Sequence, residues 1–311
     1  IGSLFDGAGW FPALVLEEGA VWDKPTSANF MDTLVGMFPS NMWEAFRTAN
    51  MLQVIVIALF FGGSILAAGE KANLVRNFVD SAYAVIEKLM AFVISLSPIG
   101  VFTYMAWVVA TQGAAILGDL VLVLLCAYLS YILHAVIVYS TTVRTLGGVS
   151  PLKFFKGMAP AMIFAFSSAS SVGTLPLTIE CSEKMGADKE IAAFTLPLGA
   201  TINMDGTAIY QGVCAIFIAS CFGIDLTLGE MATIVVTATL ASIGTAGVSG
   251  AGMIMLAMVL TSIGVDVNLI MIIYGVDRLF DMGRTCLNVA GDISGTLCIS
   301  AWETKKTAKS K

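Results

Sequence analysis

Residues 276–292 read VDRLFDMGRTCLNVAGD, a charged and polar series inside a long apolar run. At about 100° per residue in a helix, five polar side chains fall within a sector of roughly 80°: Asp277, Asp281, Arg284, Asn288 and Asp292. Ionisable groups are costly at membrane depth, so they face a protein interior or a watery cavity and mark the path of a solute. Because three carboxylates accompany one guanidinium, this polar stripe has an excess of negative charge. That excess favours a role in binding a cation over a purely structural ion-pair network.

The rest of the chain has the composition of a polytopic helical membrane protein. Apolar residues make up 57% of its 311 residues and charged residues 12%, against about 45–50% and 25% in soluble domains. Six apolar runs approach or exceed the roughly 20 residues of a spanning helix: 51–68, 90–112, 117–142, 191–221, 231–262 and 267–300. The net charge of −6 offers no basic surface for nucleic acid. The cysteines form no CxxC pair, so neither a disulfide framework nor a cysteine metal site is indicated.

The distribution of lysine and arginine predicts the orientation of the chain. These residues follow the first and third apolar runs and form the C-terminal tail, whereas the connectors near 113–118, 222–229 and 263–267 carry none. Under the positive-inside rule the C-terminus is therefore cytoplasmic. All the basic connectors lie on the cytoplasmic side only if residues 151–185 and 227–262 each return to the side from which they entered, as re-entrant hairpins.

Both segments contain small, hydroxylated and helix-breaking residues. Residues 167–176 read SSASSVGTLP and residues 242–252 read SIGTAGVSGAG. Interrupted backbone at membrane depth is tolerated where protein or a polar cavity satisfies it. Tight helix packing through small residues is the alternative explanation. Two interrupted segments, each followed by a long apolar helix, favour a repeat with a central binding site.

A second polar island, TINMDGT at 201–207, lies within an apolar run. Gly206 permits a local break that exposes carbonyl oxygens beside Asp205, and hard cations such as sodium take oxygen ligands. The planar fork of Arg284 can hold a carboxylate by two parallel hydrogen bonds. Together these features indicate coupled movement of an anion and cations. His134 could be a proton relay, but we expect a packed neutral imidazole because no acidic residue lies within a helical turn.

Four motifs resemble those of the dicarboxylate/amino acid:cation symporter family, which includes archaeal aspartate and mammalian glutamate transporters: SSVGTLP, TLPLGATINMDGTAIYQGV, ASIGTAGVSGAG and FDMGRTCLNVAGD. The resemblance runs from about Thr33 to Glu303. It implies an all-α polytopic membrane protein with inverted repeats and two re-entrant hairpins. It also implies a homotrimer in which each transport domain slides like an elevator against a fixed scaffold. Three further scaffold helices are expected before Ile1.

On this resemblance the chain divides into four parts. Residues 1–32 form an extracellular loop, 33–112 scaffold and trimerisation helices, 113–303 the transport domain and 304–311 a cytoplasmic tail. The transport domain is expected to contain these elements in order: a helix at 113–143, hairpin one at 151–185, a broken helix at 189–222, hairpin two at 227–262 and a last helix at 267–302.

The resemblance also implies binding residues. Arg284 would grip the substrate's side-chain carboxylate, and Asp281, with Thr285 beside it, would bind the amino group. The other implied substrate residues are Ser171, Thr207, Val248 and Asn288. One sodium site would use Gly199, Asn203, Asn288 and Asp292, and a second, mainly through carbonyls, Thr201, Met204, Ser242, Ile243 and Thr245. Asp205 with Asn203 would form part of a third, whose remaining residues would precede Ile1.

The sequence departs from the family pattern at two places. An additional arginine that relatives carry near the site is replaced by Ala169 and Met282, and Arg278 is a candidate substitute. Gln211 stands where mammalian members carry a proton-accepting glutamate. This second departure favours coupling to sodium alone.

The expected function is sodium-coupled symport of aspartate or glutamate by a multi-pass protein of the plasma membrane, or of the inner membrane if bacterial. Its partners would be sodium ions, membrane lipid and copies of itself. A sodium- or proton-coupled carrier of C4-dicarboxylates or neutral amino acids is an alternative, as is an ion channel. An intramembrane protease is the enzymatic alternative, with GVSG at 247–250 or an Asp205–Asp281 pair. We expect no enzyme, because the only histidine precedes Ser249 and no GxGD motif is present.

Overall fold

The computed structural model describes residues 38–47, 51–95, 116–243 and 251–310, together with scattered single positions that include Thr245. Every regular element in these residues is helical, which confirms the expected all-α class for this part of the chain. The chain divides into two compact units, one of residues 23–113 and one of residues 1–22 with 114–311.

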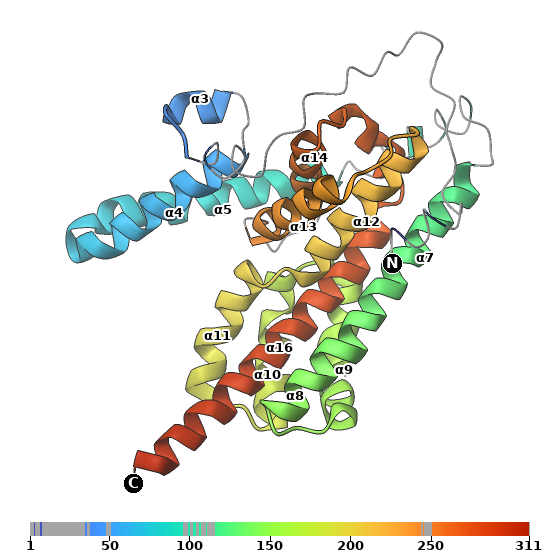
Figure 1. Ribbon diagram of the computed structural model, residues 1–311. Helices are drawn as coiled ribbons and strands as arrows, with labels where there is room; N and C mark the ends of the chain where they lie inside the picture. The colour runs from blue at the N-terminus through green and yellow to red at the C-terminus, as the bar shows by residue number, and fades with distance from the viewer. Residues whose placement is uncertain are drawn as a thin grey trace. The chain divides into compact units, whose positions relative to one another are not determined.

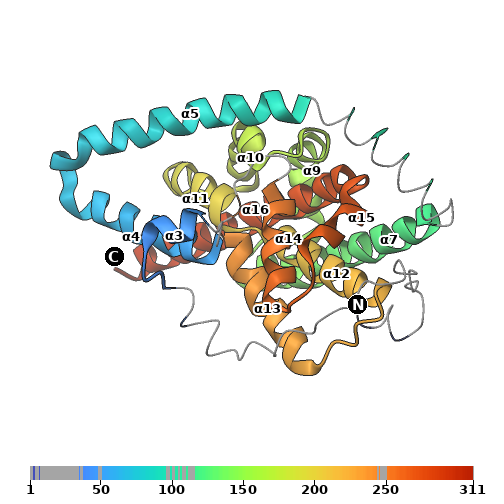
Figure 2. The same ribbon diagram turned by 90° about the horizontal axis from the view of Figure 1, so that it is seen from above.

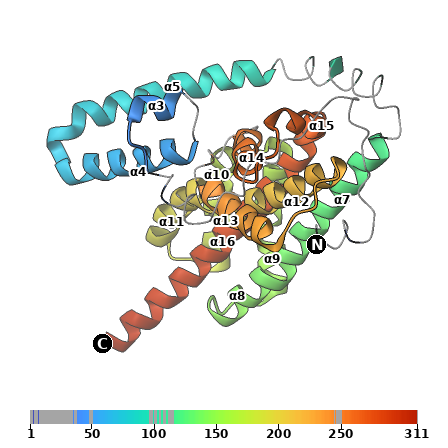
Figure 3. The ribbon, with the colours of Figure 1, turned by 45° about the horizontal axis from the view of Figure 1, so that its top comes forward.

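The smaller unit consists of short and long helices with little buried surface. Its elements are α3 (Met42–Arg47), α4 (Met51–Ala68), the 3-10 turn η1 (Gly69–Ala72) and α5 (Asn73–Ser95). Helix α3 packs on α4, and η1 connects α4 to α5 (Figure 3). Large apolar side chains, among them Phe60, Leu66, Leu74 and Phe78, are exposed within the unit.

The larger unit is built around its last helix, α16. Its main elements are α7 (Ile116–His134), the π-helical segment η2 (Ala135–Tyr139), α8 (Ser140–Thr145), α9 (Pro151–Ser168), α10 (Ser171–Met185), α11 (Lys189–Ile202), α12 (Asp205–Cys221), α13 (Leu228–Ile243), α14 (Ala251–Ser262) and α16 (Asp277–Ser310). Helices α7, α9, α10, α11 and α12 all pack on α16 (Figures 1 and 2). Side chains of α16 can therefore form a site together with residues of any of these five helices.

Side chains in the sequence set several helix ends. Ser150 precedes α9 and Ser170 precedes α10, and the hydroxyl of each accepts a hydrogen bond from a backbone N–H in the first turn. Thr227 and Glu230 form a reciprocal capping box at the start of α13. Gly186 ends α10 with φ +109°, a conformation that glycine adopts at little cost.

The run from 189 to 222 is broken in mid-course. Helix α11 ends at Ile202 and α12 begins at Asp205; between them Asn203 is extended and Met204 is neither helical nor extended. Gly206, which the sequence suggested as the cause, lies instead in the first turn of α12. A Cβ there would overlap the backbone carbonyl of Arg284, so this glycine permits close contact between α12 and α16.

The segment 267–302, expected as one helix, is divided. A 3-10 turn η3 (Val267–Ile270) and a short helix α15 (Met271–Tyr274) precede α16, which continues to Ser310. Gly275 follows α15, and glycine has a low helix propensity. Asp277 then begins α16, where a negative charge is favourable.

Two helices in the described residues are long and apolar enough, by length and composition, to cross a membrane. They are Gly118–Thr145 and Lys189–Cys221, the second including the break. Two shorter apolar helices lie at Leu228–Ile243 and Gly252–Ser262.

Candidate functional site

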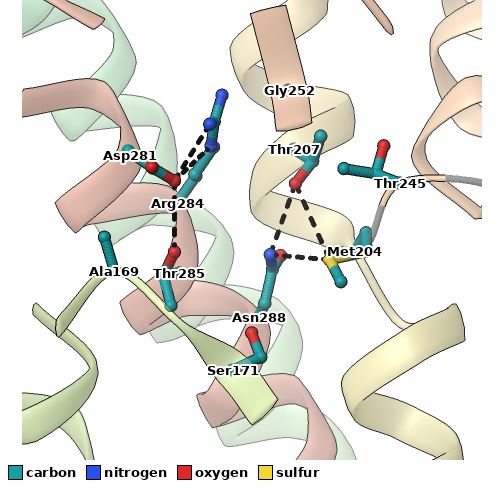
Figure 4. Close-up of a pocket in the computed structure, with 10 residues that line it drawn as sticks. All are labelled: Ala169, Ser171, Met204, Thr207, Thr245, Gly252, Asp281, Arg284, Thr285 and Asn288. Carbon is teal, nitrogen blue, oxygen red and sulfur yellow. Dashed lines mark hydrogen bonds and ion pairs between the residues drawn. The ribbon is translucent and has the colours of Figure 1, made fainter. Parts of the chain in front are cut away.

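A small pocket lies where the broken backbone at 203–204 and the start of α10 meet α16 (Figure 4). It is lined by Ala169, Ser171, Met204, Thr207, Thr245, Gly252, Asp281, Arg284, Thr285 and Asn288. Every implied substrate residue that the structure describes lines this pocket, whereas Val248 lies outside the described residues. The pocket volume is about 10 Å³, near the smallest that admits one water molecule. A larger solute therefore enters only if a wall of the pocket moves.

Arg284 is held by carboxylates of its own helix. Its Nε and Nη2 each lie 2.9 Å from Oδ1 of Asp281, and its Nη1 lies 3.7 Å from Oδ1 of Asp277. Tyr210 donates a hydrogen bond of 2.8 Å to Asp277, and the guanidinium carbon lies 4.6 Å from the centre of the Tyr210 ring. All these side chains are buried, so Arg284 compensates, away from water, part of the negative charge of the two carboxylates.

One nitrogen of the guanidinium keeps its hydrogen-bonding capacity. Among the described residues, Nη1 of Arg284 has no hydrogen-bond partner although it is buried. Gly252 in α14 lies directly against it, and a Cβ at that position would overlap Nη1. A buried donor without an acceptor is costly. The unsatisfied donor Nη1 of Arg284 therefore faces Gly252, a position of α14 that has no side chain.

The turn between α9 and α10, which is the tip of residues 151–185, lies beside Asp281 and Arg284. Ala169, between α9 and α10, adopts the left-handed conformation with φ 51° and ψ 40°, and the buried Ser171 begins α10. Nη2 of Arg278 donates to the backbone carbonyls of Ser167 at 3.3 Å and Ser168 at 3.4 Å. A cation at the C-terminal end of α9 is favourable. Arg278 thus connects α16 to this tip, near the position of the arginine that the family resemblance led us to expect.

Asn288 connects α16 to the start of α12. Its Oδ1 accepts a hydrogen bond of 2.7 Å from the backbone N–H of Gly206, and its Nδ2 lies 3.3 Å from Oγ1 of Thr207. The same Nδ2 lies 3.1 Å from the sulfur of Met204, as Figure 4 shows. This amide holds the broken segment in place against the central helix.

The residues implied for one sodium site lie together. Nδ2 of Asn203 donates to Oδ1 of Asp292 at 3.0 Å and approaches the carbonyl oxygen of Asn288 at 3.4 Å. Gly199 is adjacent, since a Cβ there would lie 2.6 Å from Oδ1 of Asp292. Across the described part of the chain, no three His, Cys, Asp or Glu side chains form a metal cluster. The oxygens that meet here are the carboxylate of Asp292 and the backbone carbonyl of Asn288, and hard cations take oxygen ligands of these kinds.

The residues implied for a second sodium site are only partly assembled. Met204 and Thr245 line the same pocket, and the backbone N–H of Thr245 donates to the carbonyl of Ser242 at 3.0 Å. Thr201 and Ile243 are exposed, and the structure brings neither to this group through a described contact. A site of this kind would use backbone carbonyls, and most of residues 244–250 lie outside the described part of the chain.

Asp205 bonds to residues that the sequence did not connect with it. Tyr139 donates a hydrogen bond of 2.8 Å to its Oδ2, and Nε2 of His134 lies 3.5 Å from the same oxygen. The expectation of a packed neutral imidazole at His134 considered only acidic residues within one turn of its own helix, and the structure adds an acidic neighbour from α12. Because Asp281 bonds to Arg284 instead, the two aspartates of the protease alternative have different partners.

Several residues near the site carried no clear sequence signal. Gly252 was one of many small residues in an interrupted segment, and Tyr210 and Tyr139 look like core aromatics. Gln211, singled out for the missing glutamate, is fully buried, and its amide atoms have no hydrogen-bond partner among the described residues.

Buried charges on a central helix, next to a helix broken in mid-course, are the features of a membrane secondary transporter. Comparison of the sequence with known families agrees with this class. Residues 14–302 match the profile described as the Sodium:dicarboxylate symporter family, and the chain belongs to that family.

Curated relatives fall into two groups. A putative sodium-dependent excitatory amino acid transporter, glt-4 of Caenorhabditis elegans, is 41% identical over 80% of this chain and 51% of the relative. Excitatory amino acid transporter 1 of Homo sapiens is 36% identical over 87% of this chain and 53% of the relative. C4-dicarboxylate transport protein 1 of Ralstonia nicotianae is 34% identical over 90% of this chain and 65% of the relative. The chain thus spans about half to two thirds of the length of these relatives.

Proposed function

We propose that this protein is a sodium-coupled symporter of acidic amino acids, aspartate or glutamate. The observation that carries the proposal is the buried pair of Asp281 and Arg284 in one small pocket. A second polar group, where Asn203 of the broken segment meets Asp292 of the same helix α16, supports a coupled cation.

An acidic amino acid can replace both members of this pair at once. Its ammonium group would take the place of Arg284 on Asp281, while its side-chain carboxylate would take the place of Asp281 on Arg284. Each buried charge then exchanges one partner for another, and neither is left uncompensated. The unsatisfied Nη1 of Arg284 supplies a further donor for the incoming carboxylate.

The alternative substrates do not satisfy both charges. A C4-dicarboxylate has no ammonium group, so it would draw Arg284 away from Asp281 without supplying a positive charge to that buried carboxylate. A neutral amino acid carries a single carboxylate, so once that α-carboxylate bonds elsewhere in the pocket it supplies no anion to Arg284, which would keep only the more distant Asp277 at 3.7 Å. Because an unpaired buried charge costs several kcal/mol, roughly 3–5, the pair favours acidic amino acids over both.

Sodium would bind at three places near the substrate. Gly199, Asn203, Asn288 and Asp292 supply the best-assembled group, and Asp205 with Asn203 supplies part of another. For a site formed by Thr201, Met204, Ser242, Ile243 and Thr245, the support is Met204 and Thr245 in the substrate pocket. The negative charge of Asp292, which lies away from Arg284, would be compensated by the cation.

The family membership supports the remaining parts of the proposal. Residues 151–185 and 227–262 would be re-entrant hairpins, with Ser171 and Val248 near their tips, and hairpin two would move to admit substrate to a pocket too small for it. Residues 113–303 would slide as a transport domain against scaffold helices at 33–112. The exposed apolar side chains of α4 and α5 would face lipid or other subunits of a homotrimer in the plasma membrane, with the C-terminus in the cytoplasm.

Uptake into proteoliposomes tests the proposal directly. The full-length protein is reconstituted and supplied with labelled aspartate, glutamate, serine or succinate, each with and without an inward sodium gradient. We expect saturable accumulation of aspartate or glutamate against its gradient only when sodium is present.

Three results would contradict the proposal. Preferred uptake of succinate or serine would assign a different substrate. Accumulation driven by a proton gradient without sodium would assign a different coupling ion. Equilibration without accumulation would indicate a channel, which cannot move a solute uphill.

A further inference from the structure

We propose that Tyr139 is a positioning residue for the cation path, because its hydroxyl orients the carboxylate of Asp205 at the start of α12. The inference rests on the proposed function, since it gives a role to a residue beside one of the proposed sodium ligands. Tyr139 is not itself proposed to touch sodium or substrate.

The hydroxyl of Tyr139 joins two elements that are distant in sequence. It lies 2.8 Å from Oδ2 of Asp205 in α12 and 3.2 Å from the backbone carbonyl of Leu287 in α16. Tyr139 is 4% exposed, whereas Asp205 is half-buried. A hydrogen bond from a buried phenol to a carboxylate is charge-assisted and directional, so it restricts the orientation of that carboxylate.

The π-helical segment η2 explains how this contact forms. In a regular α-helix, side chains five residues apart point about 140° away from each other. In η2 the N–H of Ser140 donates to the carbonyl of Ala135, the i→i+5 pattern that brings residues five apart toward one face. As a result His134 and Tyr139 both reach Oδ2 of Asp205, with their rings perpendicular and 5.0 Å apart.

A glycine in α16 leaves room for the arrangement. A Cβ at Gly291 would lie 2.7 Å from the hydroxyl oxygen of Tyr139 and 2.5 Å from Nδ2 of Asn203. The same Asn203 amide donates to Asp292. Tyr139 and Asn203 therefore both contact α16 at Gly291. Tyr139 bonds to Asp205 and Asn203 bonds to Asp292, so both carboxylates are linked to the backbone around Gly291.

This geometry makes a specific prediction about Tyr139→Phe. The variant keeps the ring and its packing but removes the hydrogen bond to Asp205. A carboxylate that is free to rotate is a less prepared ligand, so we expect the sodium concentration for half-maximal uptake to rise about tenfold, equivalent to about 1.4 kcal/mol. At saturating sodium, the KM for aspartate should change by less than about twofold.

Tyr131→Phe is the matched control. Tyr131 lies on α7, is also 4% exposed, and its hydroxyl has no hydrogen-bond partner among the described residues. Removal of that hydroxyl should leave the sodium titration and the thermal midpoint of the full-length protein unchanged or slightly improved. The comparison separates the loss of one particular hydrogen bond from the loss of any tyrosine hydroxyl in this part of the fold.

Gly291→Ala provides a second, independent variant. Its methyl group would displace both the Tyr139 hydroxyl and the Asn203 amide, so sodium dependence should weaken by at least as much as in Tyr139→Phe. Combined with Tyr139→Phe, the effect of Gly291→Ala should be smaller than it is alone, because one of the displaced groups is already absent.

The outcomes divide clearly. If wild-type uptake requires no sodium, the proposed function itself fails. If wild-type uptake requires sodium but Tyr139→Phe shows the same or a lower half-saturating sodium concentration, only the positioning role is overturned. A lower value would mean that the hydroxyl competes with sodium for the oxygen of Asp205. A parallel rise in the aspartate KM at saturating sodium would also overturn it, since that indicates general distortion of the site.

Discussion

Gly252 in α14 packs directly on the guanidinium of Arg284 in α16, with no space between them for even a methyl group. The contact covers Nη1, the guanidinium nitrogen that has no hydrogen-bond partner among the described residues. The first turn of α14 therefore covers the charge that we propose binds the substrate. Any solute that reaches Nη1 must separate these two residues.

Gly252→Ala should impair transport because its methyl group overlaps Nη1 of Arg284. Either the guanidinium or α14 must shift, so we expect the apparent affinity for aspartate to fall about tenfold or more in uptake measurements. Gly212→Ala in α12 is the control, since a Cβ there meets no atom of the described part of the chain within 4 Å. That substitution should leave uptake unchanged and stabilise the helix by roughly 0.5–1 kcal/mol. Equal uptake by both variants would argue against the close contact.

Arg284→Cys should abolish uptake of acidic amino acids while some sodium binding remains. Loss of one partner of a buried charge pair costs roughly 2–5 kcal/mol, which corresponds to at least about a 30-fold loss of aspartate affinity. Binding of aspartate and of sodium to the purified full-length protein can be measured separately. Arg144→Cys, at an exposed position, is the control for the cysteine substitution. An unchanged aspartate affinity in Arg284→Cys would refute the carboxylate assignment.

Asp292→Asn should weaken the dependence on sodium. The substitution preserves the shape of the side chain beside Asn203 but removes the negative charge that would compensate a bound cation. We expect the half-saturating sodium concentration to rise by about tenfold or more, a loss of roughly 1.4 kcal/mol. Asp225→Asn, in an exposed connector, should have no effect. A sodium titration of Asp292→Asn that superimposes on that of the wild type would exclude Asp292 as a ligand.

Ala169→Gly should be tolerated better than an alanine-to-glycine change elsewhere. Ala169 has φ 51°, a left-handed conformation that costs an alanine roughly 1–2 kcal/mol and a glycine much less. The thermal midpoint should therefore stay the same or rise. Ala165→Gly, one turn earlier inside α9, should lower it, because that residue is helical and fully buried. Ala169→Val should lower it as well, because a β-branched residue resists this conformation.

Periodicity was enough to identify the central helix and its polar stripe. Asp277, Asp281, Arg284, Asn288 and Asp292 are all buried on α16 at the spacing that 100° per residue requires. The break near Asn203 was also anticipated, although it was attributed to Gly206. These features are local, since they depend on residues within a few turns of one another, and a local pattern survives whatever packs around it.

The partners of those residues depended on packing. Tyr139 and Asp205 are separated by 66 positions in the chain, and only the π-helical turn and the approach of α12 to α16 bring them within 2.8 Å. In the same way, no spacing rule relates Gly252 to Arg284, or Arg278 to the carbonyls of Ser167 and Ser168.

Composition and hydrophobic pattern therefore decide that this chain folds as apolar helices around one charged helix, because burial of an ionisable group requires compensation wherever it lies. Which groups provide that compensation depends on the tertiary structure. Arg284 has three carboxylates on its own stripe, yet it bonds to Asp281 and approaches Asp277, whereas Asp292 lies with Asn203 of the broken segment. That division of the stripe into a part that pairs with Arg284 and a part that pairs with Asn203 is set by which helices meet it, a property of three-dimensional contacts alone.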